Sequence, residues 1–333
     1  MVEFIFTLDY EIYGNGTGSL RDLVVDPTRT LAALFRKFDA PFVVFAEAVE
    51  FPKIEEAGSD ADSAAVRAQL CELREAGHEI ALHLHPWWAN ARCESGHWLL
   101  DWSERNICVL KPERVEAIIA GAISYLRDAL DDPRFTPLSF RSGLWVMQPT
   151  AVIADVLARH GVRVDSSVFK GGRIRDLGLD YRQALRNGGW WRFSADINIP
   201  DPRGLLWEVP IHTQLVPFWE MLGPKRLTLQ KRVPTAANGA PLPRRWRDFL
   251  RFRYPRKLDF CRMTFEEMRE SLEGALSRPQ PGPARPGPVV AIGHSKDLMD
   301  FEGIERFLAF LGQKGVAITT FANLLSRELS LPS

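Results

Sequence analysis

Short apolar runs alternate with amphipathic helical patterns along almost the whole chain, and this alternation restricts the fold more than any other feature. Buried parallel strands joined by helical crossovers produce such a pattern. In 333 residues, seven or eight of these units fit one distorted (β/α)7-8 barrel. The apolar runs lie at 2–8, 41–45, 79–83, 137–141, 162–165, 205–211, 288–294 and 316–320. The helical patterns lie at 63–76, 112–130, 149–160, 265–276 and 303–313, with one more after Asp26 and one after the last run.

Two stretches interrupt the alternation. Residues 169–198 are rich in Gly, Arg and Trp, and residues 222–262 are rich in Arg. We expect both to be insertions that cover the end of the barrel at which the strands finish. The tract 278–288 is rich in Pro and Gly, which favours an extended surface linker. We therefore predict a single α/β domain over residues 1–333.

Composition excludes several classes of protein. The formal net charge is zero, so a general attraction to nucleic acid is not expected. Four cysteines occur without a CxxC pair, which is typical of free thiols in a reducing compartment. The first residues read as a strand rather than a leader, and no apolar stretch approaches the ~20 residues of a membrane span. These features predict a cytoplasmic protein.

Polar and titratable side chains gather where the predicted strands end, which is where active sites form in α/β barrels. Residues two apart on a strand face the same way. Asp9 with Glu11, and His83 with His85, can therefore each point two side chains into one cavity. Two imidazoles and a carboxylate form a common site for zinc or another divalent metal. The residues at these exits are Asp9, Glu11, His83, His85, Arg141, Asp165 and His294.

The set of motifs resembles the polysaccharide deacetylase (NodB-homology) superfamily. The matching pieces occur in the family's order and span nearly the whole chain. This resemblance implies a barrel of the glycoside hydrolase/deacetylase type and a metal-dependent hydrolase. The pieces are residues 6–9, 77–83, 140–143, 164–167 and 292–294.

The resemblance implies a role for five residues. Asp9 corresponds to the catalytic base, and Arg141 to the arginine that orients this base. His83 corresponds to the first metal-binding histidine. His294 corresponds to the general acid that protonates the departing amine, and Asp165 to a motif that supports the site.

The sequence departs from the family pattern at two places, as a divergent branch does. Tyr10 occupies the place of a second aspartate, and Glu11 is the carboxylate that replaces it. Trp87 and Trp88 stand where the second histidine is usual, and His85 is the substitute. We therefore predict one divalent ion, zinc before Mn, Co or Ni, held by Glu11, His83 and His85. Either Asp9 or Glu11 can serve as the base.

The predicted reaction is N-deacetylation of an amino-sugar, in a polysaccharide or in its lipid- or nucleotide-linked precursor. Aromatic rings near strand exits can stack on sugar rings, and Tyr10, Trp87, Trp88 and Trp145 are the expected substrate contacts. One alternative is a glycoside hydrolase that uses two carboxylates. Another is a non-catalytic glycan-binding descendant of the barrel.

The stretch 224–262 mixes basic and aromatic residues. Such a segment can lie peripherally on an anionic membrane or bind a pyrophosphate-linked lipid. A solvated lid is the plainer interpretation of the same charges.

Overall fold

One mainly parallel sheet dominates the structure, a computed structural model that describes residues 2–222, 253–277 and 287–329. Its strand order is β10-β11-β7-β6-β3-β2-β1-β14, and β15 pairs with β1 outside this path. Only β10 pairs antiparallel with its neighbour in this sheet. The strands are β1 (Glu3–Tyr10), β2 (Val43–Glu47), β3 (Glu79–Leu84), β6 (Ser139–Ser142), β7 (Val164–Asp165), β10 (Trp191–Phe193), β11 (Leu206–Glu208), β14 (Val289–His294) and β15 (Ala317–Ile318).

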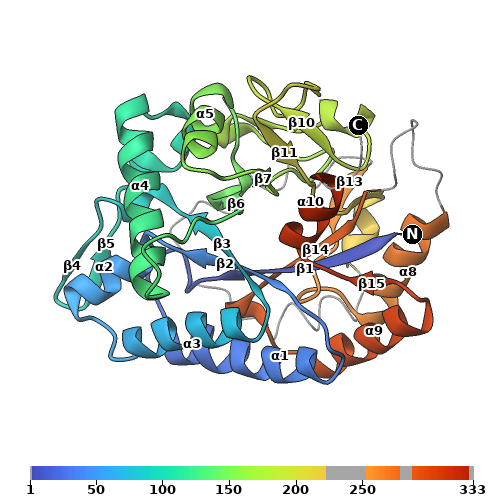
Figure 1. Ribbon diagram of the computed structural model, residues 1–333, viewed down its shortest axis with the longest axis horizontal. Coiled ribbons are helices and arrows are strands. Elements are labelled where there is room, and N and C mark those ends of the chain that lie inside the picture. The colour runs from blue at the N-terminus through green and yellow to red at the C-terminus, as the bar shows by residue number, and fades with distance from the viewer. Residues whose placement is uncertain (1, 223–252, 278–286, 330–333) are drawn as a thin grey trace.

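The two edges of this sheet come together, so that the sheet closes into a distorted barrel (Figure 1). Ile211, just after β11, forms a parallel bridge with Val290 of β14, and Asp259 forms another with Ile292. A hydrogen bond from the backbone N–H of His212 to the carbonyl of Val290, 2.9 Å long, supports the closure. The predicted barrel is therefore confirmed. In the part of the chain that the structure describes, its wall is irregular between β11 and β14.

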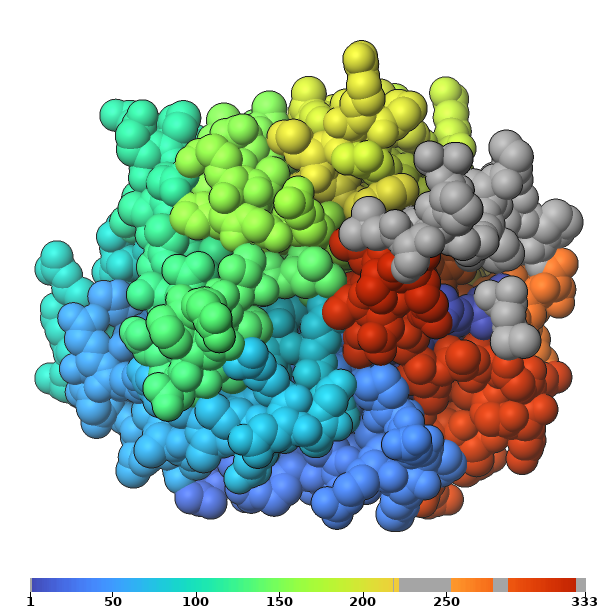
Figure 2. All heavy atoms as spheres, in the orientation of Figure 1, coloured from blue at the N-terminus to red at the C-terminus, as the bar shows by residue number. Residues whose placement is uncertain are grey.

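A small apolar cluster fills the interior of the barrel. Its members occupy alternate positions of the strands, as expected for side chains that face inward. Phe321 and Leu325 of α10 (Phe321–Leu329) complete the cluster, so α10 closes the end at which the strands begin. In the space-filling view α10, dark red, covers the centre of this face (Figure 2). The other members are Ile5, Val43, Phe45, Ala81, Val164 and Val290 on the strands, and Val209 directly after β11.

Amphipathic helices cover the outside of the barrel, and they follow the predicted patterns closely (Figure 1). A larger core lies between these helices and the outward residues of the strands, such as Phe4, Phe6 and Leu8 of β1. Apart from α10, the α-helices of the described residues are α1 (Asp26–Arg36), α2 (Glu50–Ala57), α3 (Ser63–Glu75), α4 (Pro112–Ala129), α5 (Ala151–Arg159), α8 (Phe265–Ser277) and α9 (Phe301–Gln313). Within the described residues, every helix is too short or too polar to cross a bilayer.

Small antiparallel pairs lie outside the main sheet. The predicted insertion 169–198 contains β10 and one such pair, β8 (Arg173–Ile174) with β9 (Leu179–Asp180). The others are β4 (Arg92–Glu94) with β5 (His97–Leu99), and β12 (Thr213–Val216) with β13 (Tyr254–Lys257).

Parts of the other predicted segments lie outside the described residues. Of the insertion 222–262, residues 223–252 are not described, and neither are residues 278–286 of the linker 278–288. The prediction of a single domain over 1–333 stays a prediction for this reason.

Candidate active site

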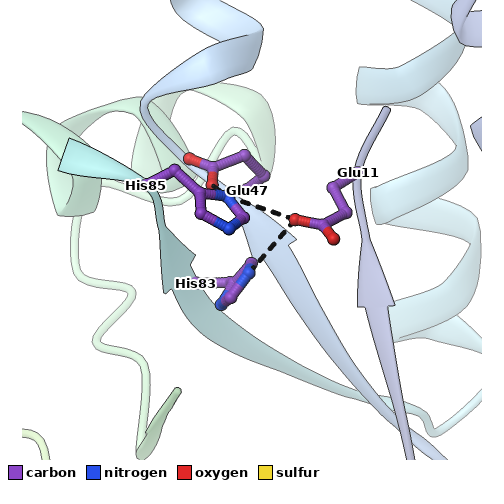
Figure 3. Close-up of side chains that lie close together, drawn as sticks. All are labelled: Glu11, Glu47, His83 and His85. Atoms are coloured by element: carbon purple, nitrogen blue, oxygen red, sulfur yellow. Dashed lines mark hydrogen bonds and ion pairs between the residues drawn. The ribbon is translucent and has the colours of Figure 1, made fainter. Parts of the chain in front are cut away.

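Four buried side chains meet where β1, β2 and β3 end: Glu11, Glu47, His83 and His85. Figure 3 shows them pointing toward one another from neighbouring strands. One ligand atom from each lies within 4.8 Å of all the others. We call this set the quartet. Buried, negatively charged oxygens and imidazoles at such separations are the arrangement that a divalent cation requires.

Hydrogen bonds orient both imidazoles of the quartet. His83 donates from Nδ1 to the backbone carbonyl of Arg141 over 2.7 Å, so its Nε2 faces Glu11 Oε2 at 3.2 Å. His85 Nδ1 lies 2.6 Å from Glu47 Oε2 and 3.2 Å from Glu11 Oε2. A backbone carbonyl behind the first imidazole is the usual support of a metal-binding histidine.

The two carboxylates of the quartet are also supported from behind. Glu47 Oε1 accepts hydrogen bonds from the backbone N–H groups of Val49 (3.0 Å) and Glu50 (3.3 Å). Lys296 Nζ lies 2.7 Å from Glu11 Oε1. Burial acts to raise the pKa of Glu11, but Lys296, His85 and His83 together hold this pKa well below its usual value. Glu11 is therefore ionised.

Asp9 and Arg141 form a fully buried ion pair beside the quartet. Arg141 Nη1 donates to Asp9 Oδ1 over 2.6 Å, and Arg141 Nε donates to the carbonyl of Ser166 over 2.8 Å. The guanidinium also lies over the ring of Phe45, 4.2 Å from its centre. Burial alone would raise the pKa of Asp9, but Arg141, His83 and His294 lower it overall. The carboxylate of Asp9 is therefore ionised, and Arg141 fixes its position.

His294 approaches the other oxygen of Asp9. Its Nε2 lies 3.6 Å from Asp9 Oδ2, and its Nδ1 lies 3.8 Å from Asp297 Oδ2. Within the described residues, Nδ1 has no hydrogen-bond partner. Burial lowers the pKa of His294, although the carboxylates of Asp9 and Asp297 oppose this effect. An imidazole in this place can exchange a proton with a group bound between it and the quartet.

Trp145 and Lys257 form the wall beside His294. The Trp145 ring lies 6.3 Å from the His294 ring, centre to centre, and is partly exposed. Lys257 Nζ lies 3.0 Å from the centre of the Trp145 ring, and burial lowers its pKa to about 7. Leu144 and Trp145 both have a positive φ, 55° and 60°, which is a strained conformation for large side chains.

Asp165 lies on β7, next to β6, the strand that carries Arg141 of the Asp9–Arg141 ion pair. Its carboxylate accepts hydrogen bonds from the backbone N–H and the hydroxyl of Ser167, both 2.9 Å long. Ser167 Oγ in turn accepts from the N–H of Ser142 over 2.9 Å, and Ser142 follows Arg141. Burial raises the pKa of Asp165, which lies beside the buried carboxyl of Glu208. Asp165 therefore positions, through Ser167, the end of β6, the strand that carries Arg141.

The structure corrects two of the predicted substrate contacts. Tyr10 alternates with the inward residues of β1, so its ring packs outside the barrel against Phe51 and its hydroxyl donates to Gln69. Trp88 is fully buried and packs against Trp98. Neither ring can contact a substrate, so both predictions were wrong.

Trp87 and Trp145 lie closer to the quartet. The Trp87 ring packs against His85, 4.4 Å between centres, and is only 2% exposed. It therefore supports His85 and does not offer a free face there. Trp145 keeps the partial exposure that a contact requires.

Sequence reasoning missed Glu47 and Lys296. Glu47 is the lone acid inside the apolar stretch 43–49, and a carboxylate is rarely buried without a partner. It also lies two residues after the inward-facing Phe45, which places it on the same side of β2. Lys296 follows His294 by two residues and left no comparable signal.

The donor set fits a divalent cation. His83 Nε2, His85 and two carboxylate oxygens offer the imidazole and carboxylate ligands that zinc, manganese, cobalt and nickel accept. His83 Nδ1 donates to the carbonyl of Arg141, so Nε2 is the nitrogen that faces the quartet. Burial opposes the charged form of His83, but Asp9, Glu11 and Glu47 raise its pKa to about 9, so a bound cation would displace the proton on Nε2. The described residues therefore hold one coherent candidate metal centre.

Comparison with known proteins informs the fold. No family model matches the sequence, and no curated protein matches it. A solved structure assigned as a polysaccharide deacetylase, from Mycobacterium smegmatis, is 13% identical with a TM-score of 0.55, over 99% of this chain and 91% of that chain. The chain shares the fold of that structure.

Two further solved structures are more distant. A family 4 carbohydrate esterase from Streptomyces lividans, in complex with acetate, is 11% identical with a TM-score of 0.41, over 95% of this chain and 91% of that chain. A family 4 pseudoenzyme from Bacillus anthracis is 8% identical with a TM-score of 0.45, over 97% of this chain and 65% of that chain. The chemistry of this chain has to be argued from its own residues.

Proposed function

We propose that this protein is a metal-dependent hydrolase that removes an acetyl group from the nitrogen of an amino-sugar. The observation that supports this proposal is the placement of three functions side by side. A quartet of residues that could hold a metal ion, a carboxylate paired with an arginine and a partly exposed histidine meet where the strands end. The solved structure with the same fold carries a polysaccharide deacetylase description, which agrees with this chemistry.

Glu11, Glu47, His83 and His85 would hold one divalent cation, and zinc is our first choice. When bound, such an ion polarises a carbonyl group and makes water easier to ionise. Arg141 fixes the carboxylate of Asp9 by an ion pair and supplies no proton itself. We therefore assign Asp9 as the base, because the carboxylate of Glu11 already lies against His83 and Lys296.

The reaction then needs two proton transfers. Asp9 removes a proton from water as the water oxygen bonds to the acetyl carbon. His294, as the imidazolium, donates a proton to the nitrogen as the C–N bond breaks. Acetate and a free amine leave. The carboxylates of Asp9 and Asp297 favour the imidazolium, and burial opposes it.

The test combines metal analysis with an assay for acetate. Protein stripped with a chelator and reloaded with zinc, manganese, cobalt or nickel is offered N-acetylated chitooligosaccharides. We expect one metal per chain and acetate release that depends on it. Asp9→Asn should keep the metal and lose about 10³-fold in rate, in line with general-base catalysis.

Three other outcomes separate the alternatives. Release of shortened sugars without acetate would indicate the glycoside hydrolase. Binding of glycan without turnover, whatever the metal content, would indicate the non-catalytic descendant. Acetate release that survives removal of all metal would contradict the proposed mechanism.

Substrate linkage and location remain predictions. Contact with an anionic membrane or a pyrophosphate-linked lipid was assigned to 224–262, and residues 223–252 lie outside the described part of the chain. A cytoplasmic location is likewise part of the proposal.

A further inference from the structure

The turn Gly143–Trp145 borders the candidate site at both of its ends, directly after β6. At one end, the backbone of Gly143 lies so close to the ring of His85 that a Cβ atom there would overlap it. At the other end, the partly exposed ring of Trp145 lies 6.3 Å from the ring of His294, centre to centre. The conformation of this turn therefore sets the position of the aromatic wall beside His294.

This turn needs support, because its backbone is in an unfavourable conformation. Leu144 and Trp145 have φ values of 55° and 60°, in the left-handed region that large side chains rarely adopt. Two such residues persist only where the surrounding structure holds them. Tyr181 holds the backbone, since its hydroxyl donates to the carbonyl of Trp145 over 2.6 Å and accepts the N–H of Met147 over 3.0 Å. The ring of Trp145 is held by a different group.

That group is the ammonium of Lys257, at the end of β13. Its Nζ lies 3.0 Å from the centre of the Trp145 ring and 4.7 Å from the centre of the Phe169 ring. The two rings are 5.8 Å apart and inclined by 71°. Within the described residues, this ammonium forms no hydrogen bond or ion pair. The attraction between a cation and the π-electrons of the two rings is therefore its main contact there.

The charge of Lys257 changes near neutral pH. Burial lowers the pKa of its ammonium to about 7, while the two nearby carboxylates raise this pKa and the two nearby guanidiniums lower it. A neutral amine attracts an aromatic ring much less than an ammonium does, because the contact depends on charge. The hold on Trp145 should consequently weaken as the pH rises through 7. The charged groups that face Lys257 are Asp259, Arg262, Asp9 and Arg141.

We propose that Lys257 is a positioning residue, which holds Trp145 in the wall of the site only in its ammonium form and so makes substrate binding depend on pH. The inference rests on the proposed function in one step, because it takes the substrate to contact the Trp145 ring. It adds regulation of that site: above neutral pH the ring is released and the affinity for substrate falls. Lys257 acts through Trp145 and takes no part in proton transfer.

The first measurement is the tryptophan fluorescence of the full chain between pH 5.5 and 8.5. In each background, the difference made by adding Trp145→Phe isolates the signal of this ring. We expect this signal to titrate in the wild type with a midpoint near pH 7. Lys257→Met and Lys257→Arg should both abolish the titration, since neither new side chain changes its charge in this range. His294→Gln should retain it, because burial lowers the pKa of His294 below the ordinary histidine value.

The second measurement is the ratio of kcat/KM between wild type and Lys257→Met for acetate release by the metal-loaded full chain. We expect a ratio of about tenfold at pH 6, almost all of it in KM, because one desolvated cation–π contact is lost. The ratio should fall to about one at pH 8.5, where Lys257 is neutral in the wild type. Deprotonation of His294 slows both proteins and cancels from the ratio. Lys257→Arg should equal the wild type at pH 6 and exceed it at pH 8.5.

Lys314→Met is the matched control, because Lys314 also lies over an aromatic ring, 5.1 Å from the centre of Phe310, and is 42% exposed. It should follow the wild type in both measurements. Thermal unfolding shows which variants are folded, and Lys257→Arg alone tests the proposal should Lys257→Met be unstable. A titration of Trp145 that persists in either Lys257 variant overturns the proposal, and so does a kcat/KM ratio that is the same at pH 6 and pH 8.5.

The two proposals fail in different ways. A titration of Trp145 that depends on Lys257, without acetate release, would leave the hold on Trp145 and remove the deacetylase. Acetate release with the same pH dependence in wild type and Lys257→Arg would leave the deacetylase and remove the pH-dependent hold.

Discussion

Glu47 is held at both of its carboxylate oxygens. Oε1 accepts two backbone hydrogen bonds, while Oε2 lies 2.6 Å from His85 Nδ1. Glu47→Gln removes one negative charge from the quartet, so we expect zinc affinity to fall about 100-fold, the upper end of what loss of a supporting partner costs. Titration of metal-free protein with zinc in a calorimeter measures this change.

Glu50 provides the matched control for that substitution. Its side chain is fully buried, and burial together with the charges of Glu47 and Glu11 raises its pKa well above the usual value. Glu50 is not one of the four residues of the quartet, and Glu50→Gln preserves the shape of this buried side chain. We expect this variant to bind zinc as the wild type does. Equal losses in the two variants would contradict the assignment of Glu47 as a ligand.

The pH dependence of kcat/KM should reflect two lowered pKa values. Loss of the proton from Asp9 opens the acidic limb, and loss of the proton from His294 closes the alkaline limb below the ordinary histidine range. Arg141 is the largest influence that lowers the pKa of Asp9, whereas burial raises it. Arg141→Met should therefore move the acidic limb to higher pH.

Rate measurements between pH 4 and 9 on wild type and the Arg141 variants check this prediction. Arg141→Lys keeps a positive charge, so its acidic limb should move less than that of Arg141→Met. An acidic limb that stays in place in both variants would show that Arg141 does not act through Asp9.

At the scale of elements, His78 connects the starts of β2 and β3. Its Nδ1 accepts the backbone N–H of Phe42 over 3.2 Å, and its ring packs on the Phe42 ring at 4.0 Å. Burial lowers its pKa from 6.5 to about 4. Below pH 6.5 the unfolded chain therefore takes up this proton before the folded chain does, and stability is lost as the pH falls toward 4.

We expect His78→Gln, which keeps an acceptor but does not titrate, to remove up to about 3 kcal/mol of this acid-induced loss. Urea unfolding at pH 7.5, 6, 5 and 4.5 gives the difference from wild type at each pH. His97→Gln, at an exposed position of β5, serves as control and should follow the wild-type curve. A His78→Gln curve parallel to that of the wild type would refute the argument.

The strands and helices of the barrel could be predicted because their apolar residues recur at different intervals along the sequence, one interval for strands and another for helices. Inward residues of β1 alternate strictly, so Asp9 and Glu11 were placed together from sequence alone. The same alternation places Tyr10 on the outer side of the barrel. The prediction of Tyr10 as a substrate contact was wrong because it did not take this alternation into account. The closure through Ile211 and Val290 could not be predicted, because it joins short segments that are far apart in the chain.

At the scale of the whole molecule, the site exists only when the two ends of the chain have come together. Lys296, just after β14, donates to Glu11 Oε1 and to the carbonyl of Ile12, just after β1. Asp9 and His294 pair across the same two strands. The quartet adds the ends of β2 and β3, so any ion bound there joins three strands of the wall.

Binding of zinc should consequently stabilise the entire fold. Without the ion, the buried carboxylates of Glu11 and Glu47 are balanced by Lys296 and by the imidazole of His83, whose pKa is raised to about 9, and burying so many charged groups is costly. A ligand that binds only the folded state at 100 times its Kd adds about 2.7 kcal/mol, so we expect the melting temperature to rise by several degrees. Scanning calorimetry of chelator-treated and zinc-loaded protein measures this rise, and His83→Ala should abolish it. Identical melting curves with and without zinc in the wild type would mean that the quartet holds no ion.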